Sequence, residues 1–165
     1  MSGARRRSWW ILAFFAVTLV VFGIGDVLGG VLADPAITLT LSGRTPAEVQ
    51  AAEPTAYRLY DFVTRSGGAN LVLIGILLAV IVAIPYRGGH RWAWWAMWIL
   101  PAWAALVPVQ FLIAGTAAGQ PPAPPMVSGP IVAVIAAGIL LVDRERFAGA
   151  SAVASTAATA SGTAA

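Results

Sequence analysis

The chain has 165 residues, of which 59% are apolar and only 10% are charged, and its net charge is +3. Soluble domains carry about 25% charged residues, so this composition excludes an ordinary soluble protein. The sequence has no cysteine and one histidine, His90. This excludes disulfides, thiolate catalysis, Cys-ligated zinc, iron–sulfur clusters and multi-histidine metal or haem sites, so we expect no metal and no cofactor.

Four long apolar segments dominate the sequence, and each comes near or exceeds the ~18 residues that a helix needs to cross a bilayer. They predict an all-α membrane protein, a four-transmembrane-helix bundle with a long, partly helical first external loop. The bundle would occupy 1–147. The uncharged Ala/Ser/Thr-rich segment 148–165 is predicted to be a disordered cytoplasmic tail. The four predicted helices are 9–32, 68–85, 92–114 and 126–142.

The first predicted helix follows three arginines and contains one acid, Asp26. Such a run also resembles a secretory signal, but it is longer than the 7–15 apolar residues of a cleaved segment, so we expect a retained membrane helix. The external loop that follows, 34–67, is too long for a simple turn. Alternating polar and apolar residues at 38–41 predict a short extended piece within it.

The second half of this loop contains helix signals. Thr45 and Glu48 form a capping-box pattern around a proline, which predicts a short helix that ends near Glu53. Residues 55–66 also have a helical pattern, and they either lie on the membrane surface or continue into the second membrane helix. We favour continuity, because the apolar part of that helix, 68–85, is short.

Prolines shape the second half of the chain. Pro101 and Pro108 each remove a backbone hydrogen bond from the third helix, and this predicts one or two bends. The proline-rich run 120–125 predicts a stiff, polyproline-like crossover before the fourth helix.

Arginine positions predict which way the bundle faces, because cytoplasmic loops carry an excess of basic residues. Seven of the ten basic residues lie beside one set of helix ends, and most tryptophans lie there too. Both termini are therefore predicted to be cytoplasmic. Alanine and arginine usage indicates a bacterium with a GC-rich genome, which makes the membrane its plasma (inner) membrane. The seven residues are Arg5, Arg6, Arg7, Arg87, Arg91, Arg144 and Arg146.

One set of polar residues falls at a common depth within the spans. At 1.5 Å per residue, Asp26 lies ~24 Å from the cytoplasmic interface, Asn70 ~22 Å and Gln110 ~28 Å. Arg65 lies about one turn beyond Asn70. We therefore predict a polar or ligand-binding layer in the outer leaflet made of Asp26, Arg65, Asn70 and Gln110, which Ser128 of the fourth helix could join.

Asp26 is the centre of this hypothesis, because an acid within a span is a candidate functional residue by default. An unpaired carboxylate in hydrocarbon costs ~2.5–3.5 kcal/mol, so Asp26 should either contact Arg65, Asn70 or Arg58, or stay protonated through desolvation. It either ties the bundle together near the headgroups, forms a ligand, proton or substrate site, or contacts a partner subunit. Gly25 and Gly29 beside it form a small-xxx-small pair that predicts close helix packing.

Two stretches carry a family resemblance: 54–65, PTAYRLYDFVTR, and 91–98, RWAWWAMW. Together they resemble a group of bacterial four-helix membrane proteins and, more distantly, the DoxX-like small membrane proteins. The resemblance covers the first three helices and implies a four-helix bundle, but it includes no catalytic motif. Small multidrug transporters also have four helices and an acid in the first, but this chain departs from them in its long first external loop.

The sequence has no catalytic or nucleotide-binding motif, so we predict a non-enzymatic structural or accessory subunit. The alternative is a small transporter or a lipid or small-molecule binder that uses the layer around Asp26. An enzyme fits least well, since one acid within the spans and no intramembrane histidine leave little acid–base chemistry. The expected partners are the lipid bilayer and either further copies of the chain or another membrane protein; the scattered arginines do not indicate nucleic acid.

Overall fold

The computed structural model describes the backbone of residues 8–162 and the side chains of residues 8–147. Within this part of the chain every regular element is a helix. In chain order the elements are α1 (Trp9–Gly29), the 3-10 turn η1 (Gly30–Leu32), α2 (Pro35–Ser42), α3 (Pro46–Ala52), α4 (Pro54–Ile81), the π-helical turn η2 (Val82–Tyr86), α5 (Arg91–Met97), α6 (Ile99–Ala114) and α7 (Pro124–Gly162).

Within the described residues, four helical stretches are long and apolar enough to cross a membrane. They are Trp9–Leu32, Pro54–Tyr86, Arg91–Ala114 and Pro124–Phe147. The predicted all-α membrane fold with four spans is therefore confirmed. The second and fourth spans are longer than predicted, because α4 already begins at Pro54 and α7 continues beyond residue 142.

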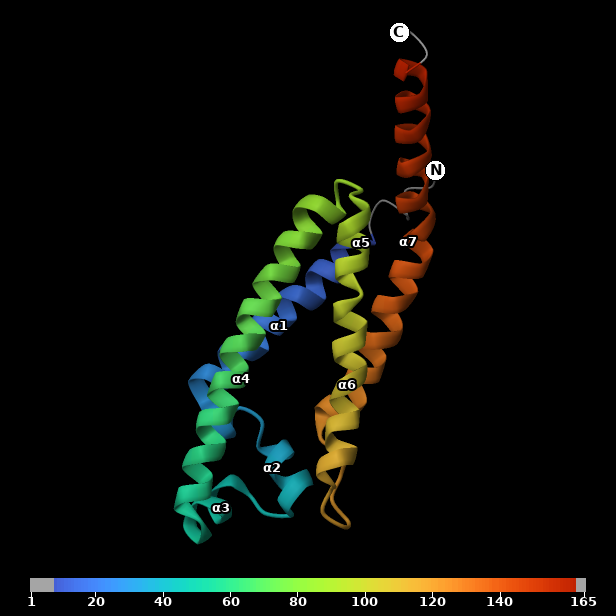
Figure 1. Cartoon of the computed structure of the whole chain (residues 1–165). Coiled ribbons are helices and arrows are strands. Elements are labelled where there is room, and N and C mark those ends of the chain that lie inside the picture. Colours follow the sequence, from blue (N-terminus) through green and yellow to red (C-terminus); the bar gives the residue numbers. More distant parts are fainter. Residues whose placement is uncertain (1–7, 163–165) are drawn as a thin grey trace.

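The four spans form two pairs. α1 packs mainly against α4, and α6 packs mainly against α7. The two pairs lie close together at the end of the bundle that contains α5, and they diverge toward the other end, where α2 and α3 lie (Figure 1). We call these ends the α5 end and the α2 end.

The buried core lies toward the α5 end, where all four spans meet. It includes Leu12 of α1, Val82 of η2, Met97 of α5 and Leu140 of α7, none of which is exposed. Between the pairs and on their outer faces, large apolar side chains are exposed, as expected for a chain whose solvent is lipid. The core thus holds the two pairs together at one end.

The extended piece predicted at 38–41 was wrong, because these residues lie within helix α2. Asp34 caps the helix by accepting a hydrogen bond from Ala36 N at 3.2 Å, and Pro35 occupies its first position. Thr40 is buried, and its hydroxyl donates to Pro121 O at 2.8 Å.

The helix signals after residue 44 were correct. Thr45 N donates to Glu48 Oε2 at 2.7 Å, and Glu48 N donates to Thr45 Oγ1 at 3.3 Å, which completes the predicted capping box of α3. The helix ends before Pro54, which opens α4. α4 then runs unbroken to Ile81, so the predicted continuity of 55–66 with the second membrane helix is confirmed.

Two of the predicted proline effects can be located. α5 ends at Met97, whose carbonyl would receive the N–H that Pro101 lacks, and α6 begins two residues later. Pro108 lies inside α6 and leaves the carbonyl of Ala104 without its helical donor. α7 approaches this carbonyl closely, since a methyl group on Gly129 would lie 2.7 Å from it.

The C-terminal prediction concerns residues that are described only in part. The backbone of α7 is helical to Gly162. The side chains of 148–162 and the whole of 163–165 lie outside the described residues. The predicted disorder of 148–165 stays a prediction, and Arg5, Arg6 and Arg7 also lie outside the described part.

Candidate functional site

The end of α1 is held by an arginine of α4. Arg65 Nη1 donates to the carbonyls of Val27 and Leu28, at 2.7 and 2.9 Å, and its Nε donates to Asp61 Oδ2 at 2.7 Å. Carbonyls in the last turn of a helix have no intrahelical donor, and a cation near them also interacts favourably with the helix dipole. Arg65 is therefore a cap for α1 supplied from another helix.

Asp61 completes this contact from the same turn of α4. Its Oδ1 accepts a hydrogen bond from Val31 N at 3.1 Å, so the carboxylate bonds both Arg65 and the backbone of η1. Gly30 has a φ of +56°, and a methyl group there would lie 1.8 Å from Asp61 Oδ1. Only glycine fits this position. We call Asp61 and Arg65 the α1 clamp.

Asp26 does not join the clamp, although its neighbours in sequence do. It is half-buried on the side of α1 that faces α4, where its Cβ lies close to Gly68. Arg65, one of the alternative partners expected for Asp26, does not contact it, because that guanidinium is bonded to Asp61 and to two carbonyls. Asp26 forms no hydrogen bond or ion pair with the described residues. Its protonation and role stay predictions.

The other members of the predicted layer are not brought together. Asn70 follows Gly68 by two residues, so it lies about 200° around α4 from the face that contacts Asp26. Gln110 belongs to α6, in the other helix pair. Asn70, Gln110 and Ser128 are all exposed. Similar depth in the membrane did not imply contact, because depth says nothing about the direction in which each helix points its side chains.

The closest approach between helices does not involve the predicted pair Gly25 and Gly29. Space around Gly25 is open, and a methyl group on Gly29 would meet only Ala33 of its own chain segment. The contact lies at Gly23, where a methyl group would approach Gly68 O to 2.6 Å. On α4 it involves Gly68 and Gly75, seven residues apart and therefore on one face.

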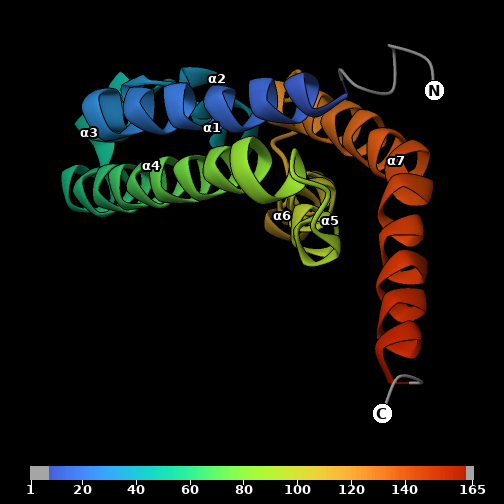
Figure 2. The same ribbon diagram turned by 90° about the horizontal axis from the view of Figure 1, so that it is seen from above.

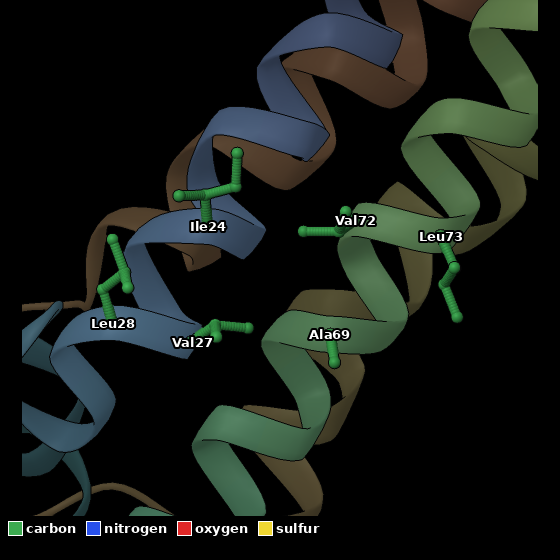
Figure 3. A pocket seen from close by; sticks show the side chains of 6 residues that line it. All are labelled: Ile24, Val27, Leu28, Ala69, Val72 and Leu73. Carbon is green, nitrogen blue, oxygen red and sulfur yellow. The ribbon is translucent and has the colours of Figure 1, made fainter.

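A groove of about 410 Å³ lies between α1 and α4 toward the α2 end (Figure 3). Its lining contains no polar group, and Asp26 is not part of it. The groove therefore fits a hydrocarbon chain and no polar solute. Its lining residues are Ile24, Val27, Leu28, Ala69, Val72 and Leu73.

The second polar cluster lies at the α5 end, and its centre is Asp143 of α7. This residue is only 2% exposed. Its Oδ2 accepts hydrogen bonds from Ser8 Oγ and from Tyr86 OH, both at 2.7 Å. Buried carboxylates require such donors, because their desolvation is otherwise unfavourable. We call Asp143, Tyr86 and Ser8 the Asp143 cluster; it joins α7, η2 and the start of α1.

Further contacts surround this cluster and fix α7. Trp94 Nε1 of α5 donates to Leu140 O at 2.8 Å, and the rings of Tyr86 and Phe147 lie with centroids 5.0 Å apart. Arg146 donates to the carbonyl of Arg87, at the turn after η2. All four spans thus meet around one buried carboxylate.

Sequence reasoning missed both clusters. The signal for the clamp was the Asp61/Arg65 spacing of four residues, which places opposite charges on one helix face. Asp143 begins a run of four charged residues, which indicated a solvated helix end, and only the fold shows that its side chain turns inward. Both clusters are bonded within the chain. Within the described residues, no three His, Asp or Glu side chains lie close enough together to hold a metal ion.

Comparisons with known proteins assign no relatives, since no family model, no curated protein and no solved structure matches the chain. The resemblance to DoxX-like proteins therefore stays a prediction. The candidate sites are interpreted below from their geometry alone.

Proposed function

We propose that this chain is a non-enzymatic structural or accessory subunit of a membrane assembly. The observation that carries the proposal is that Asp61, Arg65 and Asp143, three charged residues within the spans, bond to other groups of the same chain. The α1 clamp caps a helix, and the Asp143 cluster joins the spans. A transport or catalytic site needs polar groups that are free to meet a solute, and neither cluster offers them.

The surroundings of Asp26 support the same proposal. The groove nearest to it is lined only by apolar side chains. A solute pathway would require polar groups around the acid, as intramembrane proton and ion paths do. Asp26 instead packs against Gly68 of α4. We interpret it as part of the α1–α4 packing.

The proposed location is the plasma (inner) membrane of a bacterium, with both termini in the cytoplasm. Arg87 and Arg146 lie together at the α5 end, where α1 also begins, so the arginine-rich side is one physical end of the bundle. Basic residues stay on the cytoplasmic side during insertion. Single cysteines at Gly89 and Ala117 test the orientation, because the chain has no native cysteine. An impermeant maleimide should label only the second in intact cells.

The central test substitutes Asp26 by Asn and by Ala and measures abundance and particle mass after mild detergent extraction. The proposal expects a particle heavier than the 17.1 kDa chain, and both variants either remain in it or lose the fold. Two normally folded variants in an unchanged particle, combined with a transport or lipid phenotype of the strain, would contradict the proposal. Gly25→Ala is the matched control, because space beside Gly25 is open.

A second candidate function is the binding of a lipid acyl chain in the apolar groove. The specific observation is its uniform hydrocarbon lining at membrane depth. Ala69→Leu would fill the groove, whereas Ile76→Leu, outside it on the same helix, conserves volume. If the groove binds lipid, native mass spectrometry should show fewer retained phospholipids for Ala69→Leu only. Equal retention in both variants would exclude this function.

A further inference from the structure

One exposed face of α4 carries a regular seam. Its residues follow one another at alternating spacings of four and three, the pattern of the a and d positions of a coiled coil. The five apolar members are between 48% and 66% exposed, Ser66 is half-buried and Asn70 is exposed. The α4 seam consists of Leu59, Val63, Ser66, Asn70, Leu73, Leu77 and Val80.

Most of the seam lies on the side of α4 away from α1, and Leu73, at the edge of the seam, also lines the groove between α1 and α4. The two glycines that α4 buries against α1, Gly68 and Gly75, lie on the opposite face. Figure 2 shows α1 along one side of α4 and no helix along most of the other side. The seam is therefore an unpartnered helix face of about six turns.

Asn70 distinguishes this face from a helix face that contacts only lipid tails. It is exposed within an apolar span and forms no hydrogen bond with the described residues. Lipid tails offer no hydrogen-bonding group, so its amide requires a polar partner at the same depth. Ser66, the only other polar member, lies one turn away on the same seam.

We propose that a second copy of the chain covers the α4 seam, forming a parallel two-fold dimer in which the two Asn70 side chains bond each other. A carboxamide is both donor and acceptor, so it is complementary to itself across a two-fold axis. A second copy inserts with the same orientation and therefore presents Asn70 at the required depth. Val63, Asn70 and Leu77 occupy a positions, and one asparagine at an a position fixes register and favours two strands.

This inference rests on the proposed function, whose unnamed partner it identifies as the chain itself. In such a dimer, the side chains of each α4 seam would insert as knobs into the holes between the side chains of the other seam. Leu73 and Leu77, 66% and 59% exposed, would insert beside the amide pair. Association within a bilayer depends on such packing and on hydrogen bonds, because lipid is as apolar as leucine.

Disulfide formation in native membranes tests the dimer directly, because the full chain contains no cysteine. Leu73→Cys and Leu77→Cys should form oxidant-induced dimers. Ile76→Cys is the matched control: Ile76 is on the same helix and 49% exposed, but lies off the seam. We expect several-fold more dimer from the seam positions. Equal yields from Leu73→Cys and Ile76→Cys would overturn the proposal and leave the seam facing lipid.

The role of the amide is tested in the Leu73→Cys background. Asn70→Leu should lower the crosslinked fraction by about threefold or more, because leucine replaces a hydrogen bond that lipid does not offer. Asn70→Gln keeps the amide and should therefore retain most of the crosslinked fraction. An unchanged yield in Asn70→Leu would overturn the proposal. A heavy particle that persists without seam crosslinks would contradict only the dimer, whereas an Asp26 transport phenotype with intact crosslinks would contradict only the proposed function.

Discussion

The two ends of the bundle each hold α1 through an aspartate, and they do so in different surroundings. At the α5 end, Asp143 is 2% exposed and accepts from the hydroxyls of Tyr86 and Ser8. At the α2 end, the Asp61 side chain is 25% exposed and pairs with Arg65, which is itself bonded to the last carbonyls of α1. The Asp143 contact joins three spans beside a fourth that packs on α7 through Trp94, whereas the α1 clamp joins two spans.

This difference indicates which end of the bundle contributes more to the free energy of unfolding. A buried carboxylate cannot be rehydrated without opening the core, and losing it leaves the buried hydroxyl of Tyr86 unsatisfied. A partly exposed ion pair exchanges its partner for water at little cost. We therefore expect the α5 end to set the global stability of the chain. The α2 end, where the pairs diverge, should respond locally.

The largest effect is expected from Asp143→Ala. The substitution removes the acceptor of one buried and one part-buried hydrogen bond, and we expect a loss of about 3 kcal/mol or more in the free energy of unfolding. Thermal unfolding in detergent, followed by size-exclusion chromatography, measures it. Tyr86→Phe removes one of the two bonds and should cost about 1 kcal/mol. A stability of Asp143→Ala close to that of Tyr86→Phe would show that the cluster does not anchor the core.

The second largest effect is expected at the contact between α1 and α4. A methyl group on Gly68 would lie 2.6 Å from Asp26 Cβ and 2.7 Å from Gly23 O, so Gly68→Ala must push the helices apart. Overpacking of this kind costs about 1–3 kcal/mol. Gly67→Ala is the matched control, because nothing lies within 4 Å of its added methyl group. Thermal unfolding of both variants should show a loss only at Gly68; equal behaviour would argue against the close contact.

The sequence predicted where the helices begin and end better than which faces of the helices contact one another. Hydropathy and length identified four helices, and Thr45 with Glu48 located α3, because these signals are local. The polar layer failed for a physical reason. Asp26 lies against α4 and Asn70 lies on an exposed face of α4, although their depths are similar, and which face of α4 meets α1 depends on the long-range fit of Gly23 against Gly68. Asp143 was missed likewise, since its donors come from segments more than fifty residues away.

A smaller effect is expected when the α1 clamp is broken. Arg65→Gln removes the charge that bonds the carbonyls of Val27 and Leu28, and Asp61→Asn weakens the same contact from the other side. Both should increase hydrogen exchange at the end of α1 and in η1 while leaving thermal unfolding nearly unchanged. Arg58→Gln is the control on the same helix. Global destabilisation as large as that of Asp143→Ala would reverse the ranking of the two ends.

The smallest effect is a pH dependence confined to α3, at the α2 end. Hydrogen bonds from the backbone N–H and then the hydroxyl of Thr45 hold the pKa of Glu48 below its ordinary value. A group with a lowered folded-state pKa stabilises the fold above its ordinary pKa, and this contribution is lost as the pH falls through the lowered value. The α3 amides should therefore lose exchange protection in acid, after correction for intrinsic rates. The Glu48→Gln variant keeps a side chain that can cap α3 but has no titratable group there. The exchange protection of its α3 amides should therefore not vary with pH. If the parent chain behaved identically to this variant, the charged form of Glu48 would not be what holds α3.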